Sequence, residues 1–126
     1  MAVEHNHAKI VSAMIAAGCD VNRPRPNGSS QLMGACAKGF AAVVAVLIAA
    51  GADVNFARLS DGVTACMAAS ANGFPECLQL LLDAGADPRI ADHEGCTALA
   101  LAEHFNRPAV VAMLEAKLAE LAASQA

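Results

Sequence analysis

The feature that most constrains this chain is a motif that recurs at a nearly constant interval. A glycine followed two residues later by aspartate occurs in three places, and the glycines lie 33 and 34 residues apart, at Gly18, Gly51 and Gly85. Two further markers keep the same spacing: the glycines Gly28, Gly62 and Gly95, and the alanines Ala35, Ala69 and Ala102. Three markers in one register indicate stacked supersecondary units, each too small to bury its own core.

Each unit has the local pattern of two helices joined by a tight turn. In one of them, residues 30–38 are small and apolar, Gly39 ends the segment, and residues 40–50 form a second apolar segment that ends at Gly51. A glycine after a helix commonly takes a left-handed conformation. The hydroxyls that precede the first segments, Ser30, Thr64 and Thr97, are suited to cap free helical amides. Pro75 and Pro108 suit the first turn of the second helices. The sequence therefore predicts an all-α fold.

Composition supports close-packed helices and argues against nucleic-acid binding. Of the 126 residues, 56% are hydrophobic but only 3% are aromatic, so the apolar content is aliphatic and rich in alanine, the best helix former. The formal net charge is −4 and there are only four Phe, which disfavours phosphate neutralisation and base stacking. The length suits a single domain, with approximate repeats at 1–22, 23–55, 56–89 and 90–126.

Membrane insertion and secretion are also disfavoured. The longest apolar run, residues 40–52, is shorter than the roughly 18 residues that a membrane span needs. We interpret it as a buried helix, and no signal-peptide pattern opens the chain. The five cysteines include no CxxC pair, which is typical of reduced thiols in a cytoplasmic protein. We therefore expect no membrane partner and a cytoplasmic location.

These motifs resemble those of ankyrin repeats over essentially the whole chain. The family pattern Thr-Pro-Leu-His-x-Ala is partly matched by Thr64-Ala65-Cys66-Met67-Ala68-Ala69, and the pattern Gly-Ala-Asp-Val-Asn is complete at residues 51–55. The resemblance implies a solenoid of stacked antiparallel helix pairs joined by hairpin-like loops. It also implies a non-enzymatic module that binds another protein across a concave surface of loop tips and first helices. The family's histidine, which ties neighbouring loops together, is absent. We expect weaker polar links, with Met33 and Met67 packed in its place.

The candidate binding residues are the variable positions of the loops and first helices. They are Arg23, Arg25, Asn27, Ser29, Lys38, Arg58, Ser60, Asp61, Asn72, Arg89, His93, Glu94, His104 and Phe105. The arginines among them all lie in the inter-repeat loops and could select a partner that carries carboxylates. The alternative is that these charges only keep an alanine-rich stack soluble. Arg58 lies in a loop that is one residue longer than its counterparts.

Few aromatic side chains are available as binding anchors. Phe40 and Phe74 occupy equivalent positions after their glycines, where we expect them to be buried. Phe56 and Phe105 remain as candidate anchors on an accessible edge.

The two ends of the array differ from its centre. The register makes Asn6 the counterpart of Gly39 and Gly73, so the first repeat is predicted to begin halfway through its first helix. Either the chain was cut from a longer array or it lacks an N-terminal cap. A helix with an uncovered apolar face could self-associate, and this is our alternative function. At the other end, residues 109–123 predict a longer, partly polar closing helix.

The sequence offers little for catalysis, metals or cofactors. Cys96 with His93 is the best candidate for a nucleophile and base, but no oxyanion arrangement accompanies them. The histidines at 5, 7, 93 and 104 lie at opposite ends of the array, so we expect no metal site. No glycine-rich phosphate loop occurs, and we expect no cofactor. The context of Asn55 resembles that of hydroxylated ankyrin-repeat asparagines, although we favour a hydrogen bond from its side chain to the loop backbone.

Overall fold

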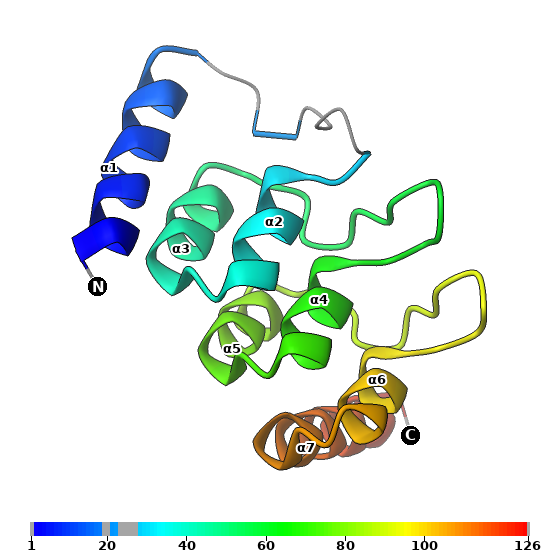
Figure 1. The fold of residues 1–126 in the computed structure, drawn as a ribbon. Coiled ribbons are helices and arrows are strands. Elements are labelled where there is room, and N and C mark those ends of the chain that lie inside the picture. Colours follow the sequence, from blue (N-terminus) through cyan, green and yellow to red (C-terminus); the bar gives the residue numbers. More distant parts are fainter. Residues whose placement is uncertain (1, 19–20, 23–27, 126) are drawn as a thin grey trace.

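The chain forms a stack of helices joined by long loops (Figure 1). The structure, a computed structural model, describes residues 2–18, 21–22 and 28–125, and within these it contains seven helices and no strand. The helices are α1 (Ala2–Ala16), α2 (Gln31–Lys38), α3 (Ala41–Ala49), α4 (Ala65–Asn72), α5 (Pro75–Asp83), α6 (Ala98–His104) and α7 (Pro108–Gln125). The predicted all-α fold is confirmed. Among the described residues, no helix has both the length and the apolar character needed to cross a membrane.

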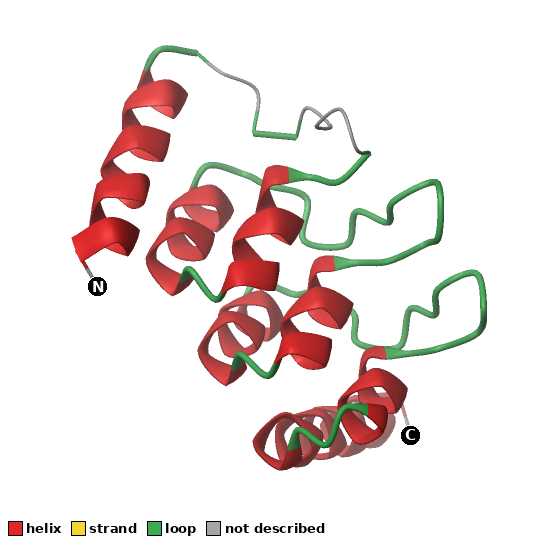
Figure 2. Cartoon of the chain, in the orientation of Figure 1, coloured by secondary structure: helices red, strands yellow, loops and turns green. Residues whose placement is uncertain are grey.

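The helices form two rows. In the inner row α2 packs against α4 and α4 against α6, while in the outer row α1, α3, α5 and α7 pack in succession. Each inner helix also packs against the outer helix that follows it in the chain. The loops that lead from an outer helix to the next inner helix project beside the inner row (Figure 2). Inner helices and loop tips therefore lie on the same side of the stack.

The helix boundaries follow the chemistry of the predicted caps. The hydroxyls of Ser30, Thr64 and Thr97 accept hydrogen bonds from the amides three residues later, at 3.1, 3.4 and 3.3 Å. Gly39 and Gly73 end the inner helices α2 and α4 at φ values of 75° and 73°. This left-handed conformation is one that glycine adopts without steric cost. Each cap thus satisfies amides or carbonyls that the helix leaves unpaired.

The core is aliphatic and continuous along the stack. Its largest fully buried side chains include Leu32, Leu47, Leu78, Leu81 and Leu114. Met33 and Met67 are also buried, as predicted.

The phenylalanines lie nearer the surface than the core leucines. Phe40 and Phe74 were expected to be buried, but they are only half-buried at the edge of the core. The reason is visible at Gly39, where an added Cβ would lie 2.7 Å from the ring of Phe74. The phenylalanine ring covers the turn of the preceding repeat and does not enter the core.

The prediction that the first repeat begins halfway through its first helix, with Asn6 at the following turn, is wrong. The backbone is helical without interruption from Ala2 to Ala16, through Asn6. The corresponding turns at Gly39 and Gly73 use a left-handed glycine, and Asn106, the counterpart of Asn6 in the last repeat, also has a positive φ of 57°. The residue type at position 6 therefore does not by itself determine whether this turn forms. α1 takes the place of an outer helix alone. The predicted closing helix is confirmed, because α7 runs for 18 residues.

Ser70 is an unpaired hydroxyl inside the stack. Its side chain in α4 is fully buried and has no hydrogen-bond partner. Burial of an unsatisfied polar group costs about 1 to 3 kcal/mol. We therefore expect Ser70→Ala to raise the free energy of unfolding by about 1 kcal/mol, measured by urea denaturation. A loss of stability of similar size would show that the hydroxyl is satisfied within the fold.

Candidate functional site

The turns after the outer helices are fixed by a ladder of aspartate and asparagine side chains. Asn22 Oδ1 accepts a hydrogen bond from the amide of Asp53 at 2.6 Å, and Asn55 Oδ1 accepts one from the amide of Asp87 at 2.7 Å. Within its own turn, Asp53 Oδ1 accepts from the amide of Asn55 at 3.0 Å. The expected bond from Asn55 to loop backbone is confirmed. Neighbouring repeats are therefore held at a defined spacing.

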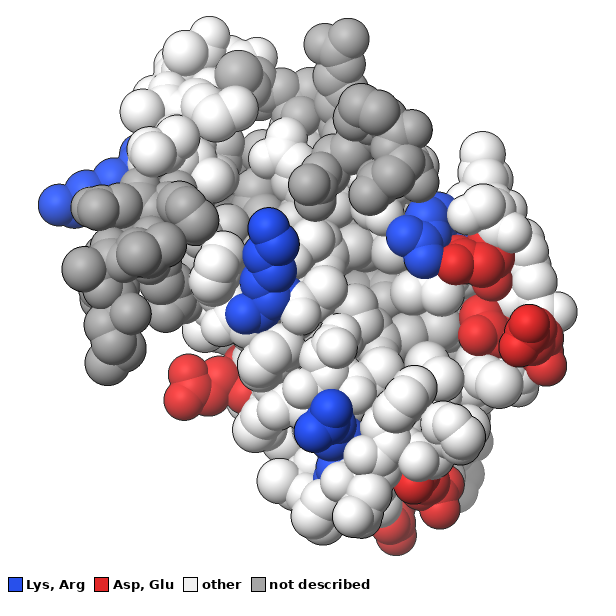
Figure 3. Space-filling model, viewed as in Figure 1, with Lys and Arg blue, Asp and Glu red and all other residues white. Residues whose placement is uncertain are grey.

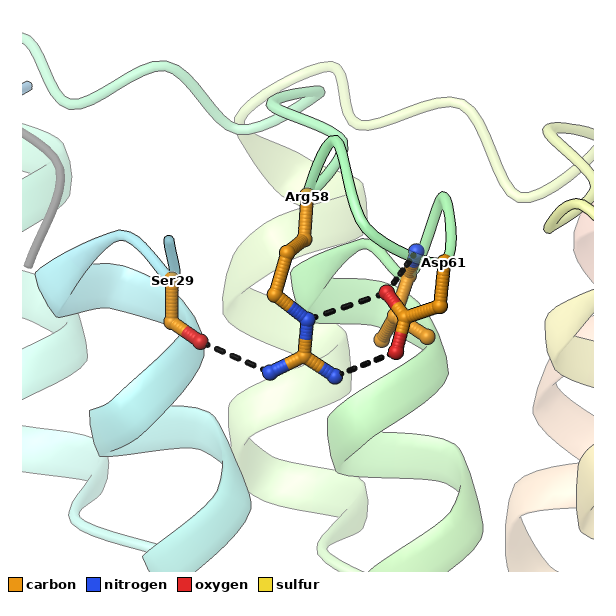
Figure 4. Close-up of polar contacts among 4 residues, drawn as sticks. Ser29, Arg58 and Asp61 are labelled. Carbon is orange, nitrogen blue, oxygen red and sulfur yellow. Dashed lines mark hydrogen bonds and ion pairs between the residues drawn. The ribbon is translucent and has the colours of Figure 1, made fainter. Parts of the chain in front are cut away.

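Arg58 joins two successive loops (Figure 4). Its Nε and Nη2 donate to the two carboxylate oxygens of Asp61 at 2.9 and 2.6 Å, while Nη1 donates to Ser29 Oγ at 2.8 Å. Ser29 is only 5% exposed. The hydrogen bond from Arg58 holds the pKa of Asp61 below its ordinary value and raises the pKa of Arg58 itself. Arg58 thus stabilises its own loop through Asp61 and also contacts Ser29 of the preceding repeat.

The next loop is organised around the Asp92 side chain and lies directly against the loop of Arg58. Asp92 Oδ1 accepts from the amides of Glu94 and Cys96, both at 2.9 Å. The amide of His93 donates to the carbonyl of Asp61 at 2.8 Å. These backbone contacts, together with Arg58, tie the loops together although the histidine of the Thr-Pro-Leu-His-x-Ala pattern is absent. The described loop tips at residues 58–63 and 92–96 therefore contact and support each other.

The Arg58 bridge should contribute modestly to stability in a pH-dependent way. Because the Arg58 and Asp61 side chains are 27% and 45% exposed, we expect Arg58→Lys to cost no more than about 1 kcal/mol at neutral pH. The folded-state pKa of Asp61 is lowered, so this contribution is fully present above the ordinary aspartate pKa and is lost as the pH falls from there through the lowered folded-state pKa. Urea titrations of both proteins across the acidic range should converge. A constant difference would contradict the ion-pair assignment.

The candidate residues at the ends of the inner helices lie together on one side. Lys38, Asn72 and His104 are the last residues of α2, α4 and α6, and all three are exposed. Phe105 follows His104, is 49% exposed, and its ring meets the His104 imidazole edge-on with centroids 4.8 Å apart. The second candidate anchor, Phe56, is half-buried against the core.

The loop candidates form a second group at the tips. Ser60, His93 and Glu94 are exposed and Asp61 is half-exposed. Arg23, Arg25 and Asn27 lie outside the described residues.

The two described loop arginines lie in different surroundings. Arg89 pairs with Asp87 at 2.9 Å and lines a recess with Lys117 and Leu121 of α7, an outer helix. Arg58, in contrast, lies among the loop tips. Figure 3 shows acidic side chains gathered at the edge where the loops project, with basic side chains set apart from one another on a largely uncharged face. Each described loop arginine is therefore neutralised by an aspartate of its own loop.

Two further residues shape this side of the molecule: Leu59, a variable position of its loop, and Arg107, which was not a candidate. Leu59 is 91% exposed at the tip of its loop. The one-residue extension of that loop is the sequence feature that points to this position. Arg107 occupies the position of Phe40 and Phe74 in the repeat register. Its Nε donates to the carbonyl of Ala71 at 3.1 Å, and its side chain covers Gly73. The repeat register identifies Arg107 as the counterpart of Phe40 and Phe74, but it does not predict the hydrogen bond to Ala71.

Three of the thiols are inside the stack. Cys36, Cys66 and Cys77 are buried, and burial raises the pKa of Cys36 above its ordinary value and that of Cys66 to about 12. Cys96 is half-exposed. In the described part of the chain, no group of three or more His, Cys, Asp or Glu could hold a metal ion.

Thiol labelling should follow this division. We expect Cys96 to react with a disulfide reagent in the native protein, and Cys36, Cys66 and Cys77 to react at least about a hundredfold more slowly, because only the exposed thiolate is reactive. Mass spectrometry of labelled peptides assigns each site. Equal rates at Cys66 and Cys96 in the folded protein would contradict the buried position of Cys66.

A family model described as ankyrin repeats in three copies matches residues 32–123. No curated protein matches the chain.

Proposed function

The chain belongs to the ankyrin repeat family, and from this premise we propose that it binds another protein across the surface formed by its inner helices and loop tips. Ankyrin repeats are generally protein–protein interaction modules. We define the inner surface by the exposed candidates at the helix ends and at the loop tips. Its members are Lys38, Asn72, His104, Phe105, Ser60, Asp61, His93 and Glu94.

The main support for the proposal is that hydrogen bonds connect neighbouring loops beneath this surface. Arg58 reaches Ser29 of the preceding repeat, and the amide of His93 bonds to Asp61 of its neighbour. Side chains held in this way lose little conformational freedom when a partner binds, so less of the interaction energy is spent on ordering. Phe105 offers the exposed aromatic group that commonly anchors such contacts.

The charges suggest what a partner would present. Lys38 forms no ion pair with the rest of the described chain, and it would favour an acidic group near the end of α2. Asp61 and Glu94 at the loop tips would favour a basic group there. The loop arginines were the basis for expecting an acidic partner, but Arg58 and Arg89 are each paired with an aspartate. On the inner surface, Lys38 is therefore the residue that supports an acidic partner. We place the interaction in the reducing cytoplasm, where thiols stay reduced.

A pair of matched double variants tests the proposal. A partner captured from the native host is titrated by calorimetry against Asn72→Arg with His104→Arg on the inner helices, and against Ala45→Arg with Ala112→Arg on the outer ones. All four positions are exposed and each pair adds two positive charges. We expect the inner pair to weaken binding at least about tenfold, or 1.4 kcal/mol, and the outer pair to leave it unchanged. Equal effects of the two pairs would contradict the proposal.

A further inference from the structure

The loop between α3 and α4 carries at its tip the most exposed large apolar side chain among the described residues. Leu59 is 91% exposed, whereas Ile10, Phe105 and Met14 are 57%, 49% and 43% exposed. Leu59 is not among the side chains that pack against the core, so packing within the fold does not account for a leucine here. Nearly its whole apolar surface is available for burial by a partner.

This tip is longer than the tip of the next loop. The amide of Arg58 donates to the carbonyl of Val63, and the amide of Asp92 donates to the carbonyl of Cys96, both at 2.9 Å. The first hydrogen bond encloses one residue more than the second. Of these two tips, only the longer one carries a large apolar side chain, Leu59.

Hydrogen bonds close the base of the tip beneath Leu59. The amide of Gly62 donates to the carbonyl of Arg58 at 2.6 Å, and both carboxylate oxygens of Asp61 accept from the Arg58 guanidinium (Figure 4). Asp61 Oδ1 also accepts from the amide of Val63 at 3.2 Å. A side chain on a base held in this way loses little conformational freedom on binding, so more of the free energy of burial contributes to affinity.

The charges beside Leu59 are acidic. The amide of His93 donates to the carbonyl of Asp61 at 2.8 Å, so the tip that contains Glu94 lies against the tip that contains Leu59. Glu94 is exposed and forms no ion pair with the rest of the described chain. Figure 3 shows acidic side chains gathered at this edge. A partner that covers Leu59 therefore meets a negative charge without a counter-ion, which favours Lys or Arg beside the apolar contact.

We propose that Leu59 is the apolar anchor of the partner complex, and that it enters a pocket of the partner protein lined by apolar side chains and bordered by Lys or Arg. This inference rests on the proposed function, because it describes the part of the same partner that contacts the loop tips. A projecting side chain needs a concave receiving surface, and an anchor buried in such a pocket commonly supplies much of the binding free energy. The other occupant, a second copy of this chain, is an outcome of the test.

Calorimetric titration of the partner captured from the native host tests the anchor. Leu59→Ala removes three carbon atoms from the tip, and the control Ile10→Ala removes three from an exposed residue of α1. We expect Leu59→Ala to raise the dissociation constant at least about tenfold and Ile10→Ala to leave it unchanged. Leu59→Met, which keeps the apolar volume, should retain most of the affinity. Circular dichroism checks that each variant is folded.

Glu94→Gln tests the cationic border of the pocket. The matched control is Glu115→Gln on the outer helix α7, and both glutamates are exposed. We expect only Glu94→Gln to weaken binding and to reduce its dependence on salt concentration. Equal salt dependence of the two variants would overturn the cationic border.

The results distinguish this inference from the proposed function. Weaker binding by Asn72→Arg with His104→Arg, but no effect of Leu59→Ala, would overturn the anchor and leave the proposed function intact. Unchanged binding in all of these variants would overturn both. Equal weakening by Leu59→Ala and Ile10→Ala, or an effect of Leu59→Ala confined to self-association in sedimentation equilibrium, would also overturn the anchor.

Discussion

Leu81→Ala is expected to lower the free energy of unfolding by about 3 to 5 kcal/mol. Leu81 lies in α5, which packs against α3, α4 and α7, and its side chain is fully buried. The loss combines the transfer free energy of the removed methyl groups with the cavity that they leave. Because the neighbouring core contains many small side chains, little is available to fill this cavity. Urea denaturation followed by circular dichroism measures the change.

Leu59→Ala provides the matched control for this prediction. It removes the same atoms from a side chain that is 91% exposed, so we expect a change within about 0.5 kcal/mol. Both substitutions remove the same atoms, one from a buried helical position and one from an exposed turn, so the excess effect at Leu81 reflects the core contribution. A Leu81→Ala effect as small as that of Leu59→Ala would mean that α5 is not packed at the centre of the stack.

Gly62→Ala should be the most damaging change at the loop tips, at about 2 to 4 kcal/mol. Gly62 has a φ of 77°, a conformation that costs a residue with a Cβ about 1 to 2 kcal/mol. Its Cβ would also lie 2.7 Å from His93 Cδ2 and 3.0 Å from the backbone nitrogen of His93. That nitrogen is already bonded to the carbonyl of Asp61. The substitution would therefore push two loops apart.

Gly95→Ala separates the cost of the backbone conformation from the cost of the contact between the loops. Gly95 is the register counterpart of Gly62, with a φ of 84° and no atom within 4 Å of an added Cβ. It should show the backbone cost alone, about 1 to 2 kcal/mol. Differential scanning calorimetry of both variants gives the excess due to contact between the loops. Equal destabilisation by Gly62→Ala and Gly95→Ala would show that the loops are not pressed together.

Features that repeat in the sequence were predictable, and those that occur once were not. The caps at Ser30, Thr64 and Thr97 and the left-handed turn at Gly39 follow from local backbone chemistry, which is the same in every repeat. The continuous helix through Asn6 does not follow from the register, because the register shows which residues correspond but not which turns form. Asn6 is helical, whereas its counterpart Asn106 has a positive φ of 57°, so the residue type alone does not decide the local conformation there.

The candidate site shows the same division. The exposed positions at the inner-helix ends, such as Lys38 and Asn72, follow from the register. The pairing of Arg58 with Asp61 and Ser29 does not, since it depends on how a loop with one extra residue bends. The arginine at 89 was grouped with Arg58 by its place in the sequence, yet it lies beside an outer helix. Side-chain direction in loops is set by tertiary contacts that a linear pattern does not contain.

The central claim, that the inner surface binds a partner protein, is tested most directly by site-specific photo-crosslinking. A benzophenone side chain is placed at Asn72 on the inner helix α4, or at Gln79 on the outer helix α5 of the same repeat; both positions are exposed. Irradiation in host extract should yield a cross-linked partner from position 72 and none from position 79. Cross-linking from position 79 alone, or equally from both positions, would contradict the account.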